Sequence, residues 1–216
     1  MTEVTTIGSN AFKGCTKIID VVLSNKITTI SGGVNTGAFQ GCTGLTSVTI
    51  PGNITSVGPC AFRGCTSLVG VTLSSGVTSL GYYSFQGCSN LETVNIPKSL
   101  TSITDDMNWH GAFSGCSKLN WSGIEFEEGI TTIISNLFRE CTGLTSVTIP
   151  GSVTSIGNNA FNGCSNITGM LTIPNNVETV GSGAFQGCSK ITGVTLSNNM
   201  TTINGGVNTG TFQGWL

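Results

Sequence analysis

Cysteine is the reactive residue type that recurs most regularly in this chain of 216 residues, which contains nine cysteines. Thiolates bind metals, form disulfides and act as nucleophiles. Eight cysteines share one slot, three residues after a phenylalanine: Cys15, Cys42, Cys65, Cys88, Cys116, Cys141, Cys164 and Cys188. Cys60 is out of register, and no C-x-x-C pair suggests zinc. The spacing instead predicts small, unbridged thiols that fill one column of a buried core.

A second group of reactive residues lies between residues 104 and 128. This stretch holds five of the ten acidic residues, two of the three tryptophans and the only histidine. Acids near a histidine suit a divalent cation, but no ligand spacing supports a site, so no metal is predicted. Insertions in a solenoid often lie on the binding face, and two fall here. We take Trp109, His110, Trp121 and Glu125 as candidate binding residues; the alternative is a degenerate repeat whose tryptophans cover the insertion.

Catalysis is not predicted. An active site needs converging acid, base or nucleophile groups, and one histidine offers few combinations. The chain has no Gly-rich phosphate loop and no G-x-S-x-G motif. We therefore expect a protein that is not an enzyme and that uses no cofactor.

An internal repeat must position all these residues. It is anchored on the phenylalanine of the phrase A-F-x-G-C: Phe12, Phe39, Phe62, Phe85, Phe113, Phe138, Phe161, Phe185 and Phe212. The intervals are 27, 23, 23, 28, 25, 23, 24 and 27 residues, so a unit of 23 carries insertions of one to five. This period suits leucine-rich repeats and is too short for helical-pair repeats such as ankyrin.

Each unit predicts a short strand. The phrase L-x-x-V-x-I ends in period-2 alternation, as in Leu45, Val48 and Ile50, which is typical of a strand with one buried face. A second short β-rich piece follows, as at 54–57. One unit cannot bury its apolar face alone, so the units must stack. We predict a single solenoid domain over 1–216: about eight repeats of 23–28 residues, parallel strands on one face, little helix, and an irregular part at about 104–130.

The outward side of the predicted strands is the second candidate site. Its column of side chains contains Val22, Thr49, Thr72, Asn95, Glu125, Thr148, Thr172 and Thr195. Threonine favours strands for steric reasons, so the column is compatible with a plain soluble sheet. A functional interpretation is a low-charge hydrogen-bonding surface for an extended partner. An ice-binding or carbohydrate-binding threonine ladder is a further alternative.

Charge and composition limit the partners. Charged residues make up 8% of the chain and the formal net charge is −2, without the clustered Lys and Arg of a nucleic-acid footprint. No apolar run is long enough to span a bilayer, and the first residues lack the regions of a signal peptide. The sequence therefore predicts no nucleic-acid partner and no membrane span.

The phrase L-T-S-V-T-I-P-G-x-V-T-S-I-G-x-x-A-F-x-G-C, nearly intact at 144–164, resembles the BspA-like class of leucine-rich repeats of bacterial and protist surface proteins. The resemblance covers essentially the whole chain. It implies adhesion or protein binding, with a host or matrix protein as partner and a cell-surface location, and it supplies no catalytic residues.

Reduced cysteines and the absent signal peptide favour an alternative, an intracellular structural component of a repetitive assembly, cytoplasmic if the sequence is complete. The half-repeats at both ends lack the polar caps of solenoids, which indicates either a fragment of a longer array or an end that another chain covers, as in end-to-end self-association.

Overall fold

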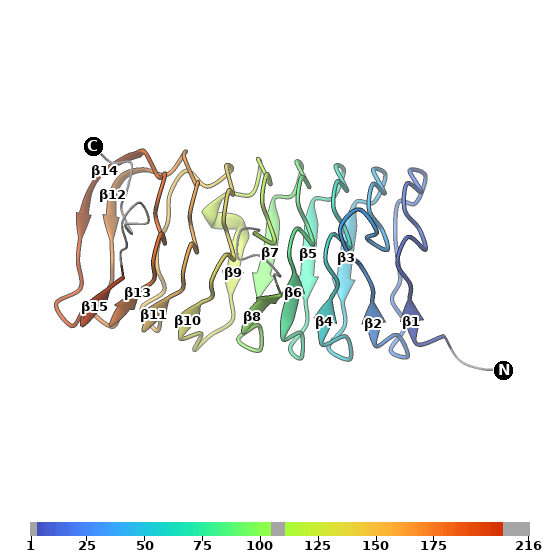
Figure 1. Cartoon of the computed structure of the whole chain (residues 1–216), viewed down its shortest axis with the longest axis horizontal. Coiled ribbons are helices and arrows are strands. Elements are labelled where there is room, and N and C mark those ends of the chain that lie inside the picture. The colour runs from blue at the N-terminus through green and yellow to red at the C-terminus, as the bar shows by residue number, and fades with distance from the viewer. Residues whose placement is uncertain (1–3, 105–110, 205–216) are drawn as a thin grey trace.

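The computed structural model describes residues 4–104 and 111–204, which form an elongated solenoid whose coils follow one another in chain order along the long axis (Figure 1). All pairings between its strands are parallel. Among the described residues, the one helical element is the 3-10 turn η1, Trp121–Gly123. The predicted leucine-rich-repeat solenoid with parallel strands and little helix is confirmed.

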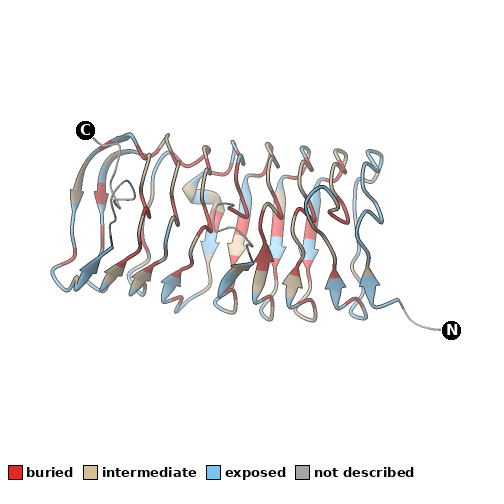
Figure 2. Cartoon of the chain, in the orientation of Figure 1, coloured by how far each residue is buried: buried red, intermediate tan, exposed pale blue. Residues whose placement is uncertain are grey.

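The L-x-x-V-x-I phrase forms a first row of strands. Its members are β3 (Ser47–Ile50), β5 (Gly70–Leu73), β7 (Thr93–Ile96), β9 (Ile124–Phe126), β12 (Thr168–Thr172) and β14 (Lys190–Thr195). The first four make one sheet in the order β3-β5-β7-β9, and the last two make another. Valine and isoleucine point inward in β3 while serine and threonine point outward, so buried and exposed residues alternate as the period predicts (Figure 2).

The second β-rich piece of each repeat forms a second row. It comprises β1 (Thr6–Ile7), β2 (Thr29–Ile30), β4 (Ser56–Val57), β6 (Ser79–Gly81), β8 (Ser102–Thr104), β10 (Thr132–Ile133), β11 (Ser155–Ile156), β13 (Thr179–Val180) and β15 (Thr202–Ile203). These strands make a five-stranded sheet from β1 to β8 and a four-stranded sheet from β10 to β15. Strands thus line two faces of each coil, where the prediction named one.

Threonine side chains explain why such short second-row strands hold together. The Thr78 hydroxyl donates to the Thr55 carbonyl at 3.0 Å, and that carbonyl also accepts from the backbone N–H groups of Thr78 and Ser79. The Thr154 hydroxyl repeats the contact with the Thr131 carbonyl at 3.2 Å. Thr28, Thr101 and Thr201 make the same kind of contact, so several rungs of the second row gain a side-chain hydrogen bond, worth roughly 0.5–1.5 kcal/mol.

The core is a column of stacked phenylalanine rings between the two rows. Neighbouring rings lie 5.1 Å apart in the pairs Phe12–Phe39 and Phe39–Phe62, with interplanar angles of 7° and 4°. From Phe39 to Phe185 these rings are fully buried. Because every ring contacts the ring of the next coil, the core is continuous along the solenoid.

The cysteine column runs beside the rings. All nine cysteines are free thiols, and all but Cys15 are buried, so the predicted cysteine column lies in the core. The Cys65 thiol donates to the Phe39 carbonyl of the preceding coil at 3.3 Å, and Cys88 does the same to Phe62. Burial raises the pKa of Cys65 to about 12, so the thiol stays protonated at neutral pH. Cys15 is exposed because its coil has no described coil on its outer side.

The stacking loosens at one junction, between the coils of Phe113 and Phe138. These two rings are 6.1 Å apart and tilted by 25°, while the other neighbouring rings lie 5.1–5.6 Å apart. Both sheets of the first five coils end here, since neither β8 with β10 nor β9 with the next coil forms a pair. The Cys141 thiol also changes partner, approaching the Cys116 carbonyl at 3.9 Å. We call this junction the seam.

Two identical segments of eleven residues, 42–52 and 141–151, lie in different environments because of the seam. Residues 47–50 form β3 and pair with β5, whereas 146–149 donate no backbone hydrogen bond to a described residue.

We expect amide hydrogens of 146–149 to exchange at least about tenfold faster than those of 47–50. Hydrogen exchange read by NMR tests this, and the identical sequences give equal intrinsic rates. Equal protection of both segments would contradict the seam.

Thiol labelling gives a second expected outcome. At mildly alkaline pH, one of nine thiols should react rapidly with a maleimide in the native protein, because Cys15 is exposed and burial holds the pKa of Cys65, Cys141 and Cys188 at about 12. Cys15→Ser should abolish the fast phase, and denaturant should release the remaining thiols. Intact-mass spectrometry counts the labels; several fast labels would show that the column is open to solvent.

Candidate functional site

The outward residues of the first row form a candidate binding face. The register pairs Thr49 with Thr72, Asn95 with Glu125, and Thr172 with Thr195. Thr148 is exposed on the unpaired segment between β9 and β12. Val22, the column's first member, is exposed near the end of the solenoid and belongs to no strand.

Three of these residues meet at two adjoining hollows. Thr72, Asn95 and Glu125 line both hollows, which have volumes of about 400 and 470 Å³. Gly123 lines the first hollow, and Phe126 and Glu127 line the second. We call this area the β5–β9 groove. It lies beside the seam, because β9 is the last strand of its sheet.

Asn95 has a structural role in the groove, because its side chain binds the backbone of the neighbouring coil. Its side-chain amide donates to the Leu73 carbonyl at 2.7 Å, and its side-chain oxygen accepts from the Leu73 N–H at 2.7 Å. The side chain thus replaces a backbone rung between β5 and β7, whose backbone pairing ends at Val71 and Val94. Asn95 lines the groove as a fixed wall, while Thr72 and Glu125 carry its exposed polar groups.

The groove is electronegative at one end. Glu125 is exposed, and Glu127 accepts a hydrogen bond from the Lys98 N–H at 2.9 Å and pairs with the Lys98 ammonium at 3.4 Å. The backbone hydrogen bond from Lys98 is the main reason that the pKa of Glu127 is lowered. Glu127 is thus already paired with Lys98, and the exposed carboxylate of Glu125 suits a partner that presents N–H donors or a positive charge.

Trp121, a candidate binding residue, lines neither hollow of the groove. Its indole packs against core rings, 5.5 Å from Phe126, 6.1 Å from Phe138 and 6.0 Å from Phe161. It fills the space at the seam and corresponds to the alternative in which a tryptophan covers the insertion. Trp109 and His110, the other two candidates from this stretch, lie outside the described residues.

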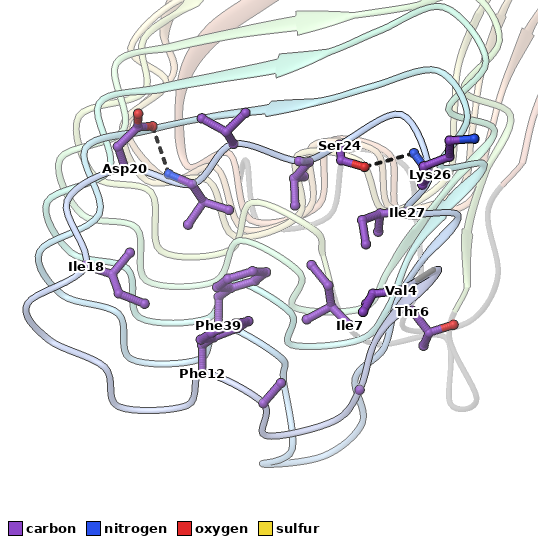
Figure 3. A pocket seen from close by; sticks show the side chains of 15 residues that line it. Val4, Thr6, Ile7, Phe12, Ile18, Asp20, Ser24, Lys26, Ile27 and Phe39 are labelled. Carbon is purple, nitrogen blue, oxygen red and sulfur yellow. Dashed lines mark hydrogen bonds between the residues drawn. The ribbon is translucent and has the colours of Figure 1, made fainter. Parts of the chain in front are cut away.

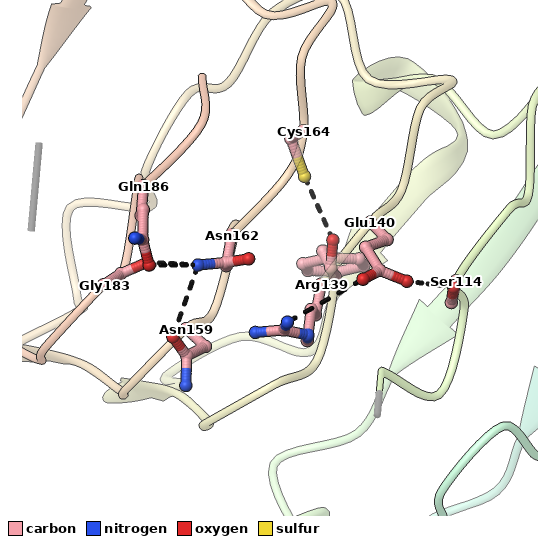
Figure 4. A network of polar contacts seen from close by, with 9 residues as sticks. Ser114, Arg139, Glu140, Asn159, Asn162, Cys164, Gly183 and Gln186 are labelled. Atoms are coloured by element: carbon pink, nitrogen blue, oxygen red, sulfur yellow. Dashed lines mark hydrogen bonds and ion pairs between the residues drawn. The ribbon is translucent and has the colours of Figure 1, made fainter. Parts of the chain in front are cut away.

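A polar network that was not predicted lies at the turns formed by the phrase A-F-x-G-C and its variants. We call this side of the solenoid the turn edge. Glu140 accepts from the Ser114 hydroxyl at 3.0 Å and lies 3.7 Å from the Arg139 guanidinium (Figure 4). On the next coils, the Asn162 amide donates to the Gln186 side chain at 2.8 Å. Glu140 has a φ of 57°, whereas its equivalents are glycines with positive φ: Gly14, Gly41, Gly64, Gly87, Gly115, Gly163 and Gly187. The signal was present, because the phrase A-F-x-G-C becomes L-F-R-E-C only there.

Tyr83 connects this network to Arg63. The Arg63 guanidinium lies 5.8 Å from the centre of the Tyr83 ring, and it donates to the Asn35 side chain at 3.2 Å. Burial, followed by the negative charge of Glu140, raises the pKa of Tyr83, so its hydroxyl remains a donor at neutral pH. Tyrosine and arginine are common in interaction hot spots, so this turn edge is a second polar surface of the scaffold.

Neither surface has the arrangement of a metal centre. Within residues 4–104 and 111–204, no three His, Cys, Asp or Glu side chains gather closely enough to hold an ion. The same residues include no helix of the length and apolar character needed to cross a membrane.

Known proteins share the repeat and the fold. The family described as "BspA type Leucine rich repeat region (6 copies)" matches residues 1–120, 32–167 and 109–211. The pneumococcal vaccine antigen PcpA is 20% identical, with a TM-score of 0.59 over 93% of this chain and 50% of its own, so the likeness concerns the fold. A leucine-rich repeat protein from Bacteroides ovatus is 22% identical over 99% of this chain and 68% of its own, with a TM-score of 0.43. A leucine rich cell surface protein from Faecalibacterium prausnitzii is 24% identical over 94% of this chain and 74% of its own, with a TM-score of 0.41. No curated protein sequence matches.

The hydrogen bonds of Asn95 predict the effect of two substitutions. Asn95→Ala should lower the free energy of unfolding by about 1–2 kcal/mol, because both Leu73 backbone groups lose a partner. Asn95→Asp keeps the acceptor but brings a carboxylate to the Leu73 carbonyl, so the neutral acid is favoured in the folded state and its pKa is raised. Its stability should therefore be greatest at acidic pH and fall as the pH rises through that pKa. Urea unfolding at acidic and at neutral pH measures both free energies of unfolding. A pH-independent loss of stability in Asn95→Asp, equal to that of Asn95→Ala, would contradict the two-way hydrogen bond.

Proposed function

Because this chain belongs to the BspA type leucine-rich repeat family, as its repeat phrase predicted, we propose that it is a non-catalytic scaffold that binds another protein through the β5–β9 groove. The observation that carries the proposal is the convergence of Thr72, Asn95 and Glu125 on two adjoining hollows of one sheet face. The family resemblance favours adhesion at a cell surface, with a host or matrix protein as the partner.

Several features support the groove over the rest of the solenoid surface. Its walls combine threonine hydroxyls with the carboxylates of Glu125 and Glu127, so it offers hydrogen bonds and negative charge together. The second row of strands offers mostly hydroxyls, and several of these already donate to backbone carbonyls. A protein that places an extended segment with basic or N–H groups across β5, β7 and β9 satisfies both kinds of group.

Binding to immobilised fibronectin, laminin and collagen tests the proposal. The wild-type chain should bind at least one of them, and Thr72→Arg should weaken binding about tenfold or more by filling the groove. Ser102→Arg is the matched control, because Ser102 is exposed on the second row and lines neither hollow of the groove. Glu125→Gln should also weaken binding and reduce its dependence on salt.

The proposal fails if the wild-type chain binds none of the three probes, or if Thr72→Arg and Ser102→Arg bind equally. Biolayer interferometry gives both affinities, and thermal unfolding checks that each variant remains folded.

A second candidate, a structural component of a repetitive assembly, is favoured by a different observation. The first described coil leaves a large apolar hollow at the end of the solenoid, on a surface separate from the groove. In this role, copies of the chain associate through their ends. Light scattering on the purified chain separates monomers from associated copies.

A further inference from the structure

The turn edge gathers most of the basic residues of the chain. They occupy two positions of the repeat: the x of the phrase A-F-x-G-C, and the second residue after its cysteine. Adjacent turns are hydrogen-bonded to each other, as where the Gly41 N–H donates to the Arg63 carbonyl at 2.8 Å. Residues that are far apart in the sequence are therefore stacked along the solenoid axis (Figure 1). We call this row the basic strip; its members are Lys13, Lys17, Arg63, Lys118, Arg139 and Lys190.

Acidic residues are nearly absent from the same turns. The phrase and the two residues after its cysteine contain six of the eight basic residues but one of the ten acidic residues, Glu140. In the first coil, the charged residues Asp20 and Lys26 lie outside the turn, because Asp20 follows Ile18 and Lys26 follows Ser24 around the coil (Figure 3). The turn edge is thus net positive, while the rest of the chain is net negative.

Most cations of the strip have no acidic partner. Arg139 pairs with Glu140, but the other five make no ion pair with a described carboxylate. Lys118 and Lys190 are exposed, in coils that have a described neighbour on at least one side, and Arg63 is half-buried. The Lys190 ammonium donates to the Asn166 side-chain oxygen at 2.7 Å, as Arg63 does to Asn35. Neutral amides therefore orient these cations without neutralising them.

The unpaired cations are widely spaced along the strip. They lie in the first, third, fifth and eighth coils, and adjacent coils are about 4.8 Å apart, so successive charged coils are separated by roughly 10–15 Å. Every turn with a cysteine places a serine or threonine directly after it, as at Thr66 and Ser89. The strip thus alternates isolated cations with hydroxyl and amide groups over the length of the solenoid.

We propose that the basic strip binds an acidic polysaccharide that lies along the solenoid axis. The carboxylate or sulfate groups of the polymer accept charge-assisted hydrogen bonds from the Lys and Arg side chains. Its sugar hydroxyls exchange hydrogen bonds with the Ser, Thr and Asn side chains between them. Because the cations are far apart, they match a polymer in which charged and neutral sugars alternate.

Other polyanions match the strip less well. Double-stranded DNA carries about one charge per 1.7 Å, and single strands stack on aromatic rings. The Tyr83 ring at this edge already packs against the Arg63 guanidinium, 5.8 Å away. Binding to an anionic membrane is favoured by apolar side chains beside the lysines, and the two basic positions carry none in the eight turns with a cysteine.

The site goes beyond the proposed function. No residue of the basic strip lines either hollow of the β5–β9 groove, so the two surfaces can be tested separately. A chain that fails to bind protein through the groove is still expected to bind the polysaccharide, and the converse also holds.

Two double variants of the full chain test the proposal with immobilised chondroitin sulfate as the probe. Lys118→Gln with Lys190→Gln should weaken binding at least about tenfold at low ionic strength, because two cations of the strip are lost. Lys26→Gln with Lys98→Gln is the matched control, since it removes the same net charge at the two basic residues outside the strip. The control should bind like the wild type. Surface plasmon resonance measures the affinities, and circular dichroism confirms that each variant is folded.

The wild-type chain should bind chondroitin sulfate but not neutral dextran, and its affinity should fall as salt is added. Absence of binding to chondroitin sulfate at low ionic strength, or equal weakening by the two double variants, would overturn the proposal. Single-stranded oligothymidylate and vesicles that contain phosphatidylserine are the competing probes. Tighter binding to either one, lost in the strip variant, would assign the strip to nucleic acid or to membranes and overturn the polysaccharide.

Discussion

The contact between one coil and the next is the interaction on which the rest of this structure depends. Parallel strands lie about 4.7–4.9 Å apart, and the phenylalanine rings between them stack at 5.1–5.6 Å away from the seam. The Phe39 ring, the Cys65 thiol and the Thr78 hydroxyl each contact the adjacent coil. Stability is consequently shared between neighbours, and a repeat has little that holds it alone.

This constraint explains where the molecule can vary. Residues inside the coil must match their neighbours, so irregularity is expected where the stacking between coils loosens. At the seam the rings separate to 6.1 Å, the strand pairing stops, and Trp121 with Phe126 fills the space against Phe138. The β5–β9 groove adjoins this irregularity, where the regular pattern gives way to Asn95 and Glu125. The groove, whose residues depart from the repeat pattern, therefore lies next to the junction where the ring stacking loosens.

The small number of charges increases the importance of their positions. With only 8% charged residues, the surface is mainly hydroxyl and glycine. Glu125 and Glu127 lie at the groove, and Arg139 and Glu140 lie on the turn edge. Each surface therefore has its own charge pattern.

The sequence by itself determined the repeat, the buried columns and the parallel solenoid. Phenylalanine and cysteine recur at fixed positions, and in a repeat architecture a position is equivalent to an environment. It also placed Thr72, Asn95 and Glu125 on one outward column. It left open whether Trp121 packs inward. It gave no indication that the Asn95 amide bonds to the Leu73 backbone or that the hollows form at β5–β9, because both depend on side chains from other coils.

The two copies of C-T-G-L-T-S-V-T-I-P-G, at 42–52 and 141–151, separate what the sequence determines from what the tertiary structure determines. Their sequences are identical, yet residues 47–50 form a strand and residues 146–149 do not. The local preference for a strand is the same in both. A strand also needs a partner at the right spacing, and β5 supplies one to 47–50, while 146–149 pair with neither β9 nor β12. Sequence decided which residues are able to pair, and only the tertiary stacking of the coils decided which of them do.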